Sequence, residues 1–308
     1  MKTEHLLKFY EQGYRDFTGV DLRGEDLSGV MLIGVNLTRA NLMGTNLSRA
    51  FLTKSDLSEA SLNWANLSYA KMSEINLESA DLTKANLTGA FMVKSQLIGS
   101  KLSGADLSYT NLRASNLFTA NISGAKLQKV NLRQANLNKV NFNWANLYEG
   151  RLTGAQLQNV SLTDVNLSQT FLIDVDLSGA NLAGIDLSQA KLARANLSKT
   201  NLSNANLEDA LLKQVNLSNA NLTNAKLNRG NLNNANLSQA NLTNADLTEA
   251  SLKQANLDSA NLTKTNLDRT NLEFAILNNT VLEGGNLLDK IQAELFPANS
   301  MHHQTQIA

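Results

Sequence analysis

Several features common in proteins of this size are missing or scarce in this 308-residue chain. It has no cysteine, which excludes disulfide bonds and thiolate metal sites. Its one proline, Pro297, stands near the C-terminus, so no proline interrupts a hydrogen-bond ladder before it. Aromatic residues make up 5%, and no apolar run is long enough to predict a transmembrane segment. The N-terminus lacks the apolar core of a signal peptide, and we expect a cytoplasmic protein.

Residues typical of catalytic sites are equally scarce. The three histidines, His5, His302 and His303, lie near the ends, so the body of the chain lacks the usual general base and metal ligand. Adjacent carboxylates such as Glu208 and Asp209 are typical of a solvated surface rather than of an acid–base pair. The spaced glycines lack the strand-then-helix context of a phosphate loop. The sequence therefore predicts a non-enzymatic protein with no cofactor, no metal ion and no small-molecule substrate.

The chain has instead a strict five-residue period. From Phe17 to Leu287 every fifth residue is Leu or another large apolar residue, which makes 55 consecutive units without insertion or deletion. The residue two positions earlier is small or β-branched, with Glu25 as the exception, and the residue between them is usually Asn or Asp. A helix would scatter these Leu residues around its whole circumference, and a straight strand would send alternate ones to opposite faces. The period therefore predicts a repeat array of another kind.

The pattern fits short extended segments separated by corners, in which the small residue and the Leu both point inward. Repeated corners coil the chain into a tube, with the apolar residues inside and three polar residues per unit outside. Glu25 stands in the first coil, where an open end leaves its charge in contact with water. The residues alone therefore predict an all-β solenoid.

Units such as 180–184 (ANLAG) and 245–249 (ADLTE) resemble the pentapeptide-repeat family, whose signature is A(D/N)LXX. The resemblance covers residues 15–289 and implies a right-handed quadrilateral β-helix with four units, or 20 residues, per coil. The array would then make about 14 coils and, at ~4.8 Å per coil, a rod roughly 65 Å long. Such long uninterrupted arrays are similar to those of cyanobacterial members, some of which act in regulation or stress responses.

Both ends of the chain change character. Within residues 1–14 we expect a short helix over 3–12 that ends at Gly13. After the array at 15–289, the spacing of Leu288, Ile291 and Leu295 predicts a helix over 290–297, followed by a disordered tail at 298–308. We interpret both helices as caps, because bare end coils expose apolar core and unpaired edges. A homodimer contact is the alternative role of the C-terminal helix, and the resemblance permits it.

Exceptions to the repeat indicate where the surface acts. The position before the central Leu carries large apolar residues at separations that are multiples of 20, which places them in one column on one wall. This apolar column consists of Met31, Phe51, Phe91, Phe171 and Leu211. Ile33, Val93 and Ile173 lie on the same wall two residues further on.

Charge follows the walls as well. The wall with the apolar column, here called the basic wall, has ten Lys or Arg residues against three acidic ones, whereas the preceding wall has six against eleven. Lys71, Arg151 and Lys191 stand within the column. Apolar residues mixed with cations are typical of a protein-binding surface, so we expect these residues to bind a protein partner. The alternative is that Phe merely shields the neighbouring backbone and that the unequal charge of the walls arose by neutral drift of the sequence.

A second group of aromatic residues is a weaker candidate for an interaction patch. Trp64 and Trp144 both occur in the sequence Asn-Trp-Ala-Asn-Leu and lie 80 residues apart, with Tyr69, Tyr109 and Tyr148 near them in the sequence. Duplication of a four-coil block explains the spacing equally well.

Two other functions compete with a protein scaffold. The family resemblance includes DNA mimics that inhibit gyrase, but such mimicry needs a strongly negative rod, and this chain has 27 basic and 27 acidic residues. The basic wall is the feature that favours weak binding to nucleic acid or to an anionic membrane. A net charge of +7 over roughly 60 Å is a low charge density for binding a nucleic acid or an anionic membrane. The Phe residues also do not form a groove in which bases could stack. The sequence favours a protein partner, whose identity it leaves open.

Overall fold

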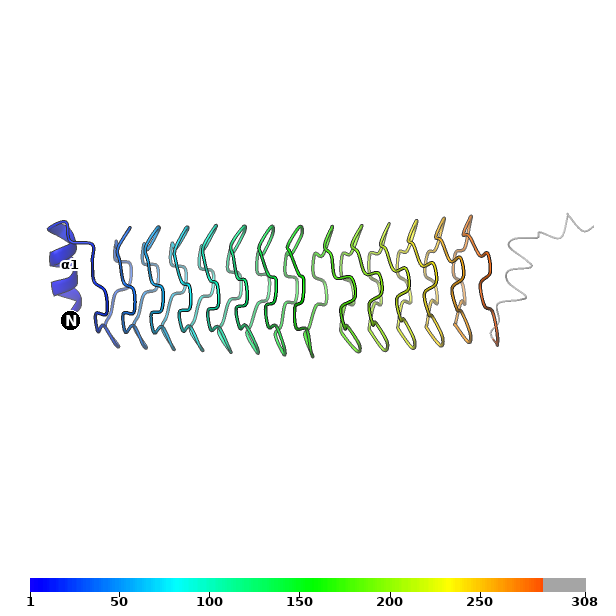
Figure 1. Cartoon of the computed structure of the whole chain (residues 1–308), viewed down its shortest axis with the longest axis horizontal. Helices are drawn as coiled ribbons and strands as arrows, with labels where there is room; N and C mark the ends of the chain where they lie inside the picture. Colours follow the sequence, from blue (N-terminus) through cyan, green and yellow to red (C-terminus); the bar gives the residue numbers. More distant parts are fainter. Residues whose placement is uncertain (285–308) are drawn as a thin grey trace, which may run out of the picture.

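The computed structural model describes residues 1–284, which form a long rod of regular coils with a helix at its N-terminal end (Figure 1). Helix α1, Thr3–Glu11, precedes the first coil. Single parallel β-bridges join units 20 residues apart, from Asp16↔Asn36 to Asn261↔Val281, with Ser161 and Asn181 as the one pair in this series that is not bridged. The fold is therefore a right-handed β-helix in which four units complete a coil. The expected C-terminal helix at 290–297, the tail at 298–308 and the end of the array at 289 lie outside the described residues.

The core is one continuous apolar column along the axis of the rod. Leu107 and Ala105 show the arrangement, because both side chains point inward and are fully buried. The same pair of positions is buried in nearly every coil, so the core runs from Leu6 of α1 to Leu272. No helix within residues 1–284 has the length and the apolar character needed to cross a bilayer.

Every corner of the coil is the same tight turn. The carbonyl of Phe17 accepts a hydrogen bond from the amide of Val20 at 3.1 Å, and Gly19 between them has a φ of +68°. A positive φ at the second of the two central residues marks a type II turn. The same left-handed conformation recurs at the equivalent residue of every unit up to Gly284, mostly without glycine, as at Lys84 with a φ of +57°. Left-handed backbone costs a non-glycine residue about 1–2 kcal/mol, so the surrounding hydrogen bonds must enforce it.

The unit at residues 66–70 shows how all five backbone amides are satisfied. The amide of Asn66 donates to the preceding coil at 3.0 Å, and those of Leu67 and Tyr69 donate to the next coil at 2.7 and 2.9 Å. The amide of Ala70 closes the turn onto the carbonyl of Leu67. The remaining amide, that of Ser68, donates to the side-chain oxygen of Asn66 at 3.1 Å. The Asn or Asp before each Leu therefore supplies the one acceptor that the backbone lacks.

Helix α1 is held on the first coil by a buried leucine and a carboxylate. The side chain of Leu6 is fully buried against the core. Glu25 takes a small-residue position of the repeat, yet its side chain is only 16% exposed. Its carboxylate accepts hydrogen bonds from Lys2 at 2.7 Å and from the amide of Thr3, at the start of α1, at 3.0 Å. These bonds lower the pKa of Glu25 to about 2. The charge is thus a partner for α1 rather than a group left open to water.

Because Asn66 completes a turn, its removal should weaken the rod. Asn66→Ala deletes the acceptor for the Ser68 amide and the bond from the Asn66 side chain to Asn46 at 3.2 Å. At ~0.5–1.5 kcal/mol per hydrogen bond, we expect a loss of about 1–3 kcal/mol in the free energy of unfolding, measured by urea denaturation. Asn66→Asp keeps the acceptor and is the matched control, with a smaller loss. Equal stability of Asn66→Ala and the wild type would contradict this role.

The contact of Glu25 with α1 should depend on pH. The folded-state pKa lies below the ordinary value of 4.5, so this contribution is complete above pH 4.5 and is lost as the pH falls toward 2. We expect amide exchange in α1 to accelerate over this range in the wild type, relative to the intrinsic rate. Glu25→Gln should show fast exchange already at pH 7. Glu59→Gln, which removes an exposed partner of Arg39 in the array, should leave α1 unchanged. The idea fails if Glu25→Gln protects α1 as well as the wild type does.

Candidate functional site

The structure places the apolar column and its cations on consecutive rungs of the basic wall. Bridges join Met31 to Phe51, Phe51 to Lys71 and Lys71 to Phe91. A second run of bridges joins Arg151, Phe171, Lys191 and Leu211 in that order. Asn111 and Asn131 occupy the two rungs between the runs. The basic wall therefore carries two apolar and cationic clusters separated by two polar rungs.

The first cluster is the more exposed of the two. Phe51 and Phe91 are 40% and 41% exposed, and Met31 is 58% exposed. Ile33 is also exposed, and Val93 is half-buried beside Phe91. The ammonium nitrogen of Lys71 lies 5.8 Å from the ring centroid of Phe91. This end of the wall thus presents large apolar side chains to solvent on both sides of Lys71.

The second cluster is built around one phenylalanine between two cations. The ammonium nitrogen of Lys191 lies 3.7 Å from the ring centroid of Phe171, and the guanidinium carbon of Arg151 lies 5.8 Å from it. Such contacts stabilise exposed sites by about 0.5–1 kcal/mol each. Phe171 and Ile173 are half-buried, whereas Leu211 is 45% exposed. The cations hold the ring in place and cover part of it.

Replacing Asn or Asp in the column removes a hydrogen bond from the turn. The amides of Thr53, Val93 and Ile173 each follow a Phe and have no hydrogen-bond partner within residues 1–284. The amide of Ile33 is instead satisfied by the Tyr10 hydroxyl of α1 at 3.2 Å. An unmade hydrogen bond has a cost, so the backbone gains nothing from Phe at these rungs. This cost weakens the alternative that Phe is present only to shield the neighbouring backbone. Amides without partners lie beside the Phe rings instead.

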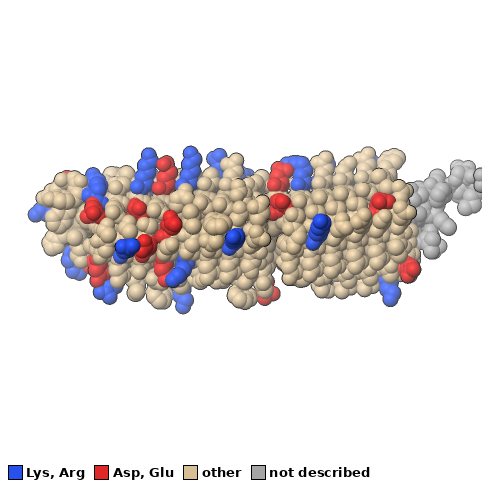
Figure 2. All heavy atoms as spheres, in the orientation of Figure 1, with Lys and Arg blue, Asp and Glu red and all other residues tan. Residues whose placement is uncertain are grey.

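The acidic residues of the basic wall are neutralised by that wall itself. Asp174 pairs with Arg194 at 2.6 Å, Glu273 with Lys253 at 2.9 Å, and Glu74 with Lys54 at 4.0 Å. The guanidinium of Arg194 lowers the pKa of Asp174. Seven cations of the wall make no ion pair within the described part of the chain: Lys71, Lys94, Arg113, Arg133, Arg151, Lys191 and Lys213. Figure 2 shows that the charged side chains gather toward the N-terminal half of the face in view.

The structure does not bring the second aromatic group together. Trp64 and Trp144 stand at one corner of the coil but four coils apart, and Tyr69 and Tyr109 stand at the next corner. Four of the five rings have separate neighbours: Lys84 lies 5.9 Å from Trp64, Lys129 lies 5.8 Å from Tyr109, the Tyr69 ring lies over Gly89, and the Tyr148 hydroxyl donates to Gln169. These residues are separate features of the surface rather than one patch.

A crevice in the middle of the rod was not anticipated from the sequence. Between the coil at 155–165 and the coil at 176–186 the ladder is interrupted, and the coils are visibly further apart in the green part of Figure 1. The bridge expected between Ser161 and Asn181 is absent. The two other walls stay closed here, as the bonds from the Leu152 amide to the Phe171 carbonyl at 2.8 Å and from the Leu167 amide to the Asp186 carbonyl at 2.9 Å show. The rod is therefore opened like a wedge on two of its four walls.

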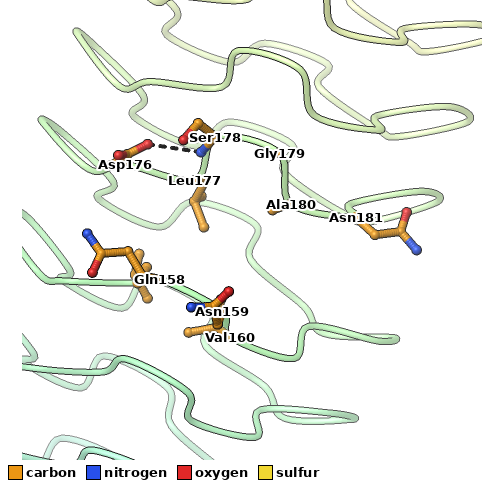
Figure 3. Close-up of a pocket in the computed structure, with 10 residues that line it drawn as sticks. Gln158, Asn159, Val160, Asp176, Leu177, Ser178, Gly179, Ala180 and Asn181 are labelled. Atoms are coloured by element: carbon orange, nitrogen blue, oxygen red, sulfur yellow. Dashed lines mark hydrogen bonds between the residues drawn. The ribbon is translucent and has the colours of Figure 1, made fainter.

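The crevice is a cavity of about 340 Å³ with polar rims and an apolar floor. Gln158, Asn159 and Val160 line one lip, and residues 176–181 line the other (Figure 3). The side chain of Leu177 points into the space between the lips in Figure 3. Leu162 and Ala180, which are core positions of the repeat, are only partly buried here.

Branched interior side chains flank the opening. Val140 stacks on Val160, and Val165 stacks on Ile185, one coil apart at the small-residue position. These are the two places within residues 1–284 where aliphatic β-branched residues stack directly at this position, and overfilling a packed core strains the backbone around it. The coils that carry each pair stay joined, by the bond from the Ser161 amide to the Val140 carbonyl at 3.0 Å and by the bridge between Asn166 and Asp186. The sequence marks the neighbourhood of the crevice through these pairs but not the interval at which the array opens.

The arrangement suits binding rather than bond-making chemistry. Within residues 1–284 no group of three His, Asp or Glu side chains is placed to hold a metal ion. The lowered carboxylate pKa values arise from ordinary turn bonds and exposed ion pairs, as at Asp21 beside Arg23, where the pKa is about 2. The candidate sites are a flat wall and a crevice, and neither carries a paired acid and base.

Comparison with known proteins agrees with the repeat. The family model "Pentapeptide repeats" matches in overlapping or adjoining stretches that run from residue 16 to residue 287. A search of the curated proteins returns no match.

Solved structures of similar proteins come from cyanobacteria and elsewhere. HetL, a pentapeptide repeat protein involved in heterocyst differentiation regulation from Nostoc sp. strain PCC 7120, is 28% identical, over 93% of this chain and 99% of HetL, with a TM-score of 0.33. Rfr23 from Cyanothece 51142 is 33% identical, over 35% of this chain and 91% of Rfr23, with a TM-score of 0.31. QnrB1, a plasmid-mediated fluoroquinolone resistance protein, is 14% identical, over 86% of this chain and 96% of its own, with a TM-score of 0.30.

Proposed function

This chain belongs to the pentapeptide-repeat family, and from that premise we propose that it is a non-enzymatic scaffold or regulatory protein that binds a protein partner through its basic wall. One observation carries the proposal. Up to residue 275, large apolar residues replace the turn-forming Asn or Asp on this wall alone, in the column from Met31 to Leu211. The replacements at Phe51, Phe91 and Phe171 leave the turn amide two residues later without a partner within residues 1–284, and those at Met31, Phe51, Phe91 and Leu211 expose a large apolar side chain, which supports a role in binding.

The chemistry of the wall defines the partner. Seven cations without ion pairs favour an acidic surface, and Phe51 and Phe91 favour apolar side chains that can cover them. The free amides of Thr53 and Val93 suit carbonyl or carboxylate acceptors of that partner. A rod already ordered by its ladder loses little conformational entropy on docking. The partner is therefore a protein with an acidic and partly apolar face.

DNA mimicry is the less favoured alternative. It requires a dense, regular negative charge along the rod, because phosphate charge dominates binding to DNA-binding surfaces. This chain has a formal net charge of zero, and several of its acidic residues are paired along the axis, such as Glu59 with Arg39. Direct binding of nucleic acid by the basic wall is also less favoured, since cations cover the Phe171 ring.

Restoring the repeat in the column tests the proposal. The triple variant Phe51→Asn, Phe91→Asn and Phe171→Asn should retain the stability of the wild type, because each Asn restores a turn bond of ~0.5–1.5 kcal/mol in place of ring contacts. Binding of the partner should be lost. Affinity capture from the native host, followed by mass spectrometry and by titration of the captured protein, measures this. Raising the salt concentration should weaken binding by the wild type.

A second triple variant, with Trp64, Tyr109 and Trp144 each replaced by Asn, is the matched control. It also removes three exposed aromatic rings, but from other walls, and we expect it to bind as the wild type does. If the column variant captures the same protein with unchanged affinity, the basic wall is not the interface. Loss of binding in the control alone would assign the interface to the tryptophan corner.

A further inference from the structure

The lips of the crevice carry backbone groups that are paired in the complete coils on either side. On the first lip, three amides that should donate to the next coil have no acceptor: Asn159, Leu162 and Asp164. On the second lip, the amide of Asn181 has lost the carbonyl of Val160, whereas the bridges Gln156↔Asp176 and Asn166↔Asp186 still join the coils at the two ends of the opening. Donors and acceptors thus alternate along both lips. Each lip is the open edge of a strand, and open edges are templates for pairing with another chain.

The space between the lips accepts side chains of a particular kind. Leu157, Val160, Leu177 and Ala180, which occupy inward positions of the repeat, line it together with the polar Gln158 and Asn159. Figure 3 shows Leu177 of one lip above Gln158 and Asn159 of the other. The cavity of about 340 Å³ lies near the lower end of ligand-site volumes, which run from ~300 to 1,000 Å³. An extended segment that presents small or Leu side chains inward and polar ones outward matches both the floor and the rim.

We propose that this crevice binds one extended polypeptide segment of a partner protein, which pairs with the free backbone groups of the lips by strand addition. Backbone bonds supply affinity in this mode, and the alternating side chains supply specificity. The segment follows the coil, with a small residue and a Leu facing inward and polar residues facing out. The site lies away from the basic wall, which stays closed across these coils, and so it does not depend on the function proposed above.

The occupant is a partner rather than this chain itself. Within residues 1–284 every unit of the array is already bonded to at least one neighbouring coil, so a second copy offers no unpaired segment from this part that could enter the crevice. Beyond Leu287 the sequence loses the five-residue pattern, so the remaining residues do not offer the inward small and Leu side chains that the crevice fits. A separate chain with that pattern is the occupant that remains.

Amide exchange in the full chain, with a synthetic peptide as the probe, tests the proposal. The peptide copies residues 234–243, NANLSQANLT, which contain two units of the inward pattern. In the free protein, the amides of residues 157–164 should exchange about tenfold or more faster than those of 137–144, which are all bonded one coil earlier. The peptide should slow the exchange of 157–164 and leave 137–144 unchanged. A peptide with proline in place of both Leu residues lacks the required N–H groups and should have no effect.

A variant with a closed ladder provides the second control. The double change Val160→Ala and Ile185→Ala removes the stacked branched side chains and should slow exchange at 157–164 about tenfold or more without any peptide. That variant should no longer bind the peptide. Val35→Ala, a branched residue that stacks on Ser55, should change neither exchange nor binding.

Three results would overturn the proposal. The first is slow exchange at 157–164 in the free wild type, which would mean a closed ladder. The second is fast exchange that the copied peptide does not slow. The third is protection without peptide that either rises with protein concentration or disappears when residues 285–308 are deleted, because a second copy or the chain's own C-terminal segment would then fill the crevice. The column variant Phe51→Asn, Phe91→Asn and Phe171→Asn should bind the peptide normally, so failure of one proposal is distinguishable from failure of the other.

Discussion

Hydrogen bonds along the axis of the rod are the interaction on which this structure depends. In each intact unit three amides pair with neighbouring coils, and one closes the turn. The fifth amide has no backbone acceptor, and the Asn or Asp before the central Leu supplies one, as Asn66 does for Ser68. The side chains also connect to one another along the rod, as in the bond from Asn66 to Asn46. The ladder thus explains a position of the repeat that packing alone leaves unexplained.

The ladder also explains why the array tolerates left-handed backbone at every corner. Residues such as Lys84 and Trp64 have a φ of +57° without being glycine. Their amides donate to the next coil at 3.0 and 3.1 Å, so leaving the left-handed conformation would break a bond on which two coils depend. Because the conformation is fixed by the array, the corner side chain is free to vary. The corner position consequently carries many different residue types, including Arg, Lys, Glu, Trp and Tyr.

The fold was predictable from the sequence because it follows from a period, whereas the details that break the period were not. The inward positions follow from the five-residue spacing, whereas the 20-residue coil came from the resemblance to the family and was supported by the multiples of 20 that separate the residues of the apolar column. Glu25 was expected to contact water, and its pairing with Lys2 and Thr3 depends on where α1 docks, which no spacing specifies. The crevice depends on how residues 20 apart meet, as at Ser161 and Asn181, and neither residue announces a missing bridge when the sequence is followed unit by unit. Local patterns predict the elements of the array, whereas the contacts between coils decide where it opens.

Departures from the repeat have opposite consequences on the two sides of the wall. An outward departure, such as Phe91, costs one turn bond but leaves the coils bonded at 2.8 and 2.9 Å, so the rod stays rigid and gains an apolar surface. The inward departures lie beside the crevice, where the amides of Asn159, Leu162 and Asp164 have lost the next coil. An outward departure adds side-chain contacts to a flat face. The crevice instead offers backbone groups with which the main chain of another segment can pair. A rod with both kinds has two ways of holding a protein, one by side chains and one by main chain, and the hydrogen-bond ladder keeps them apart.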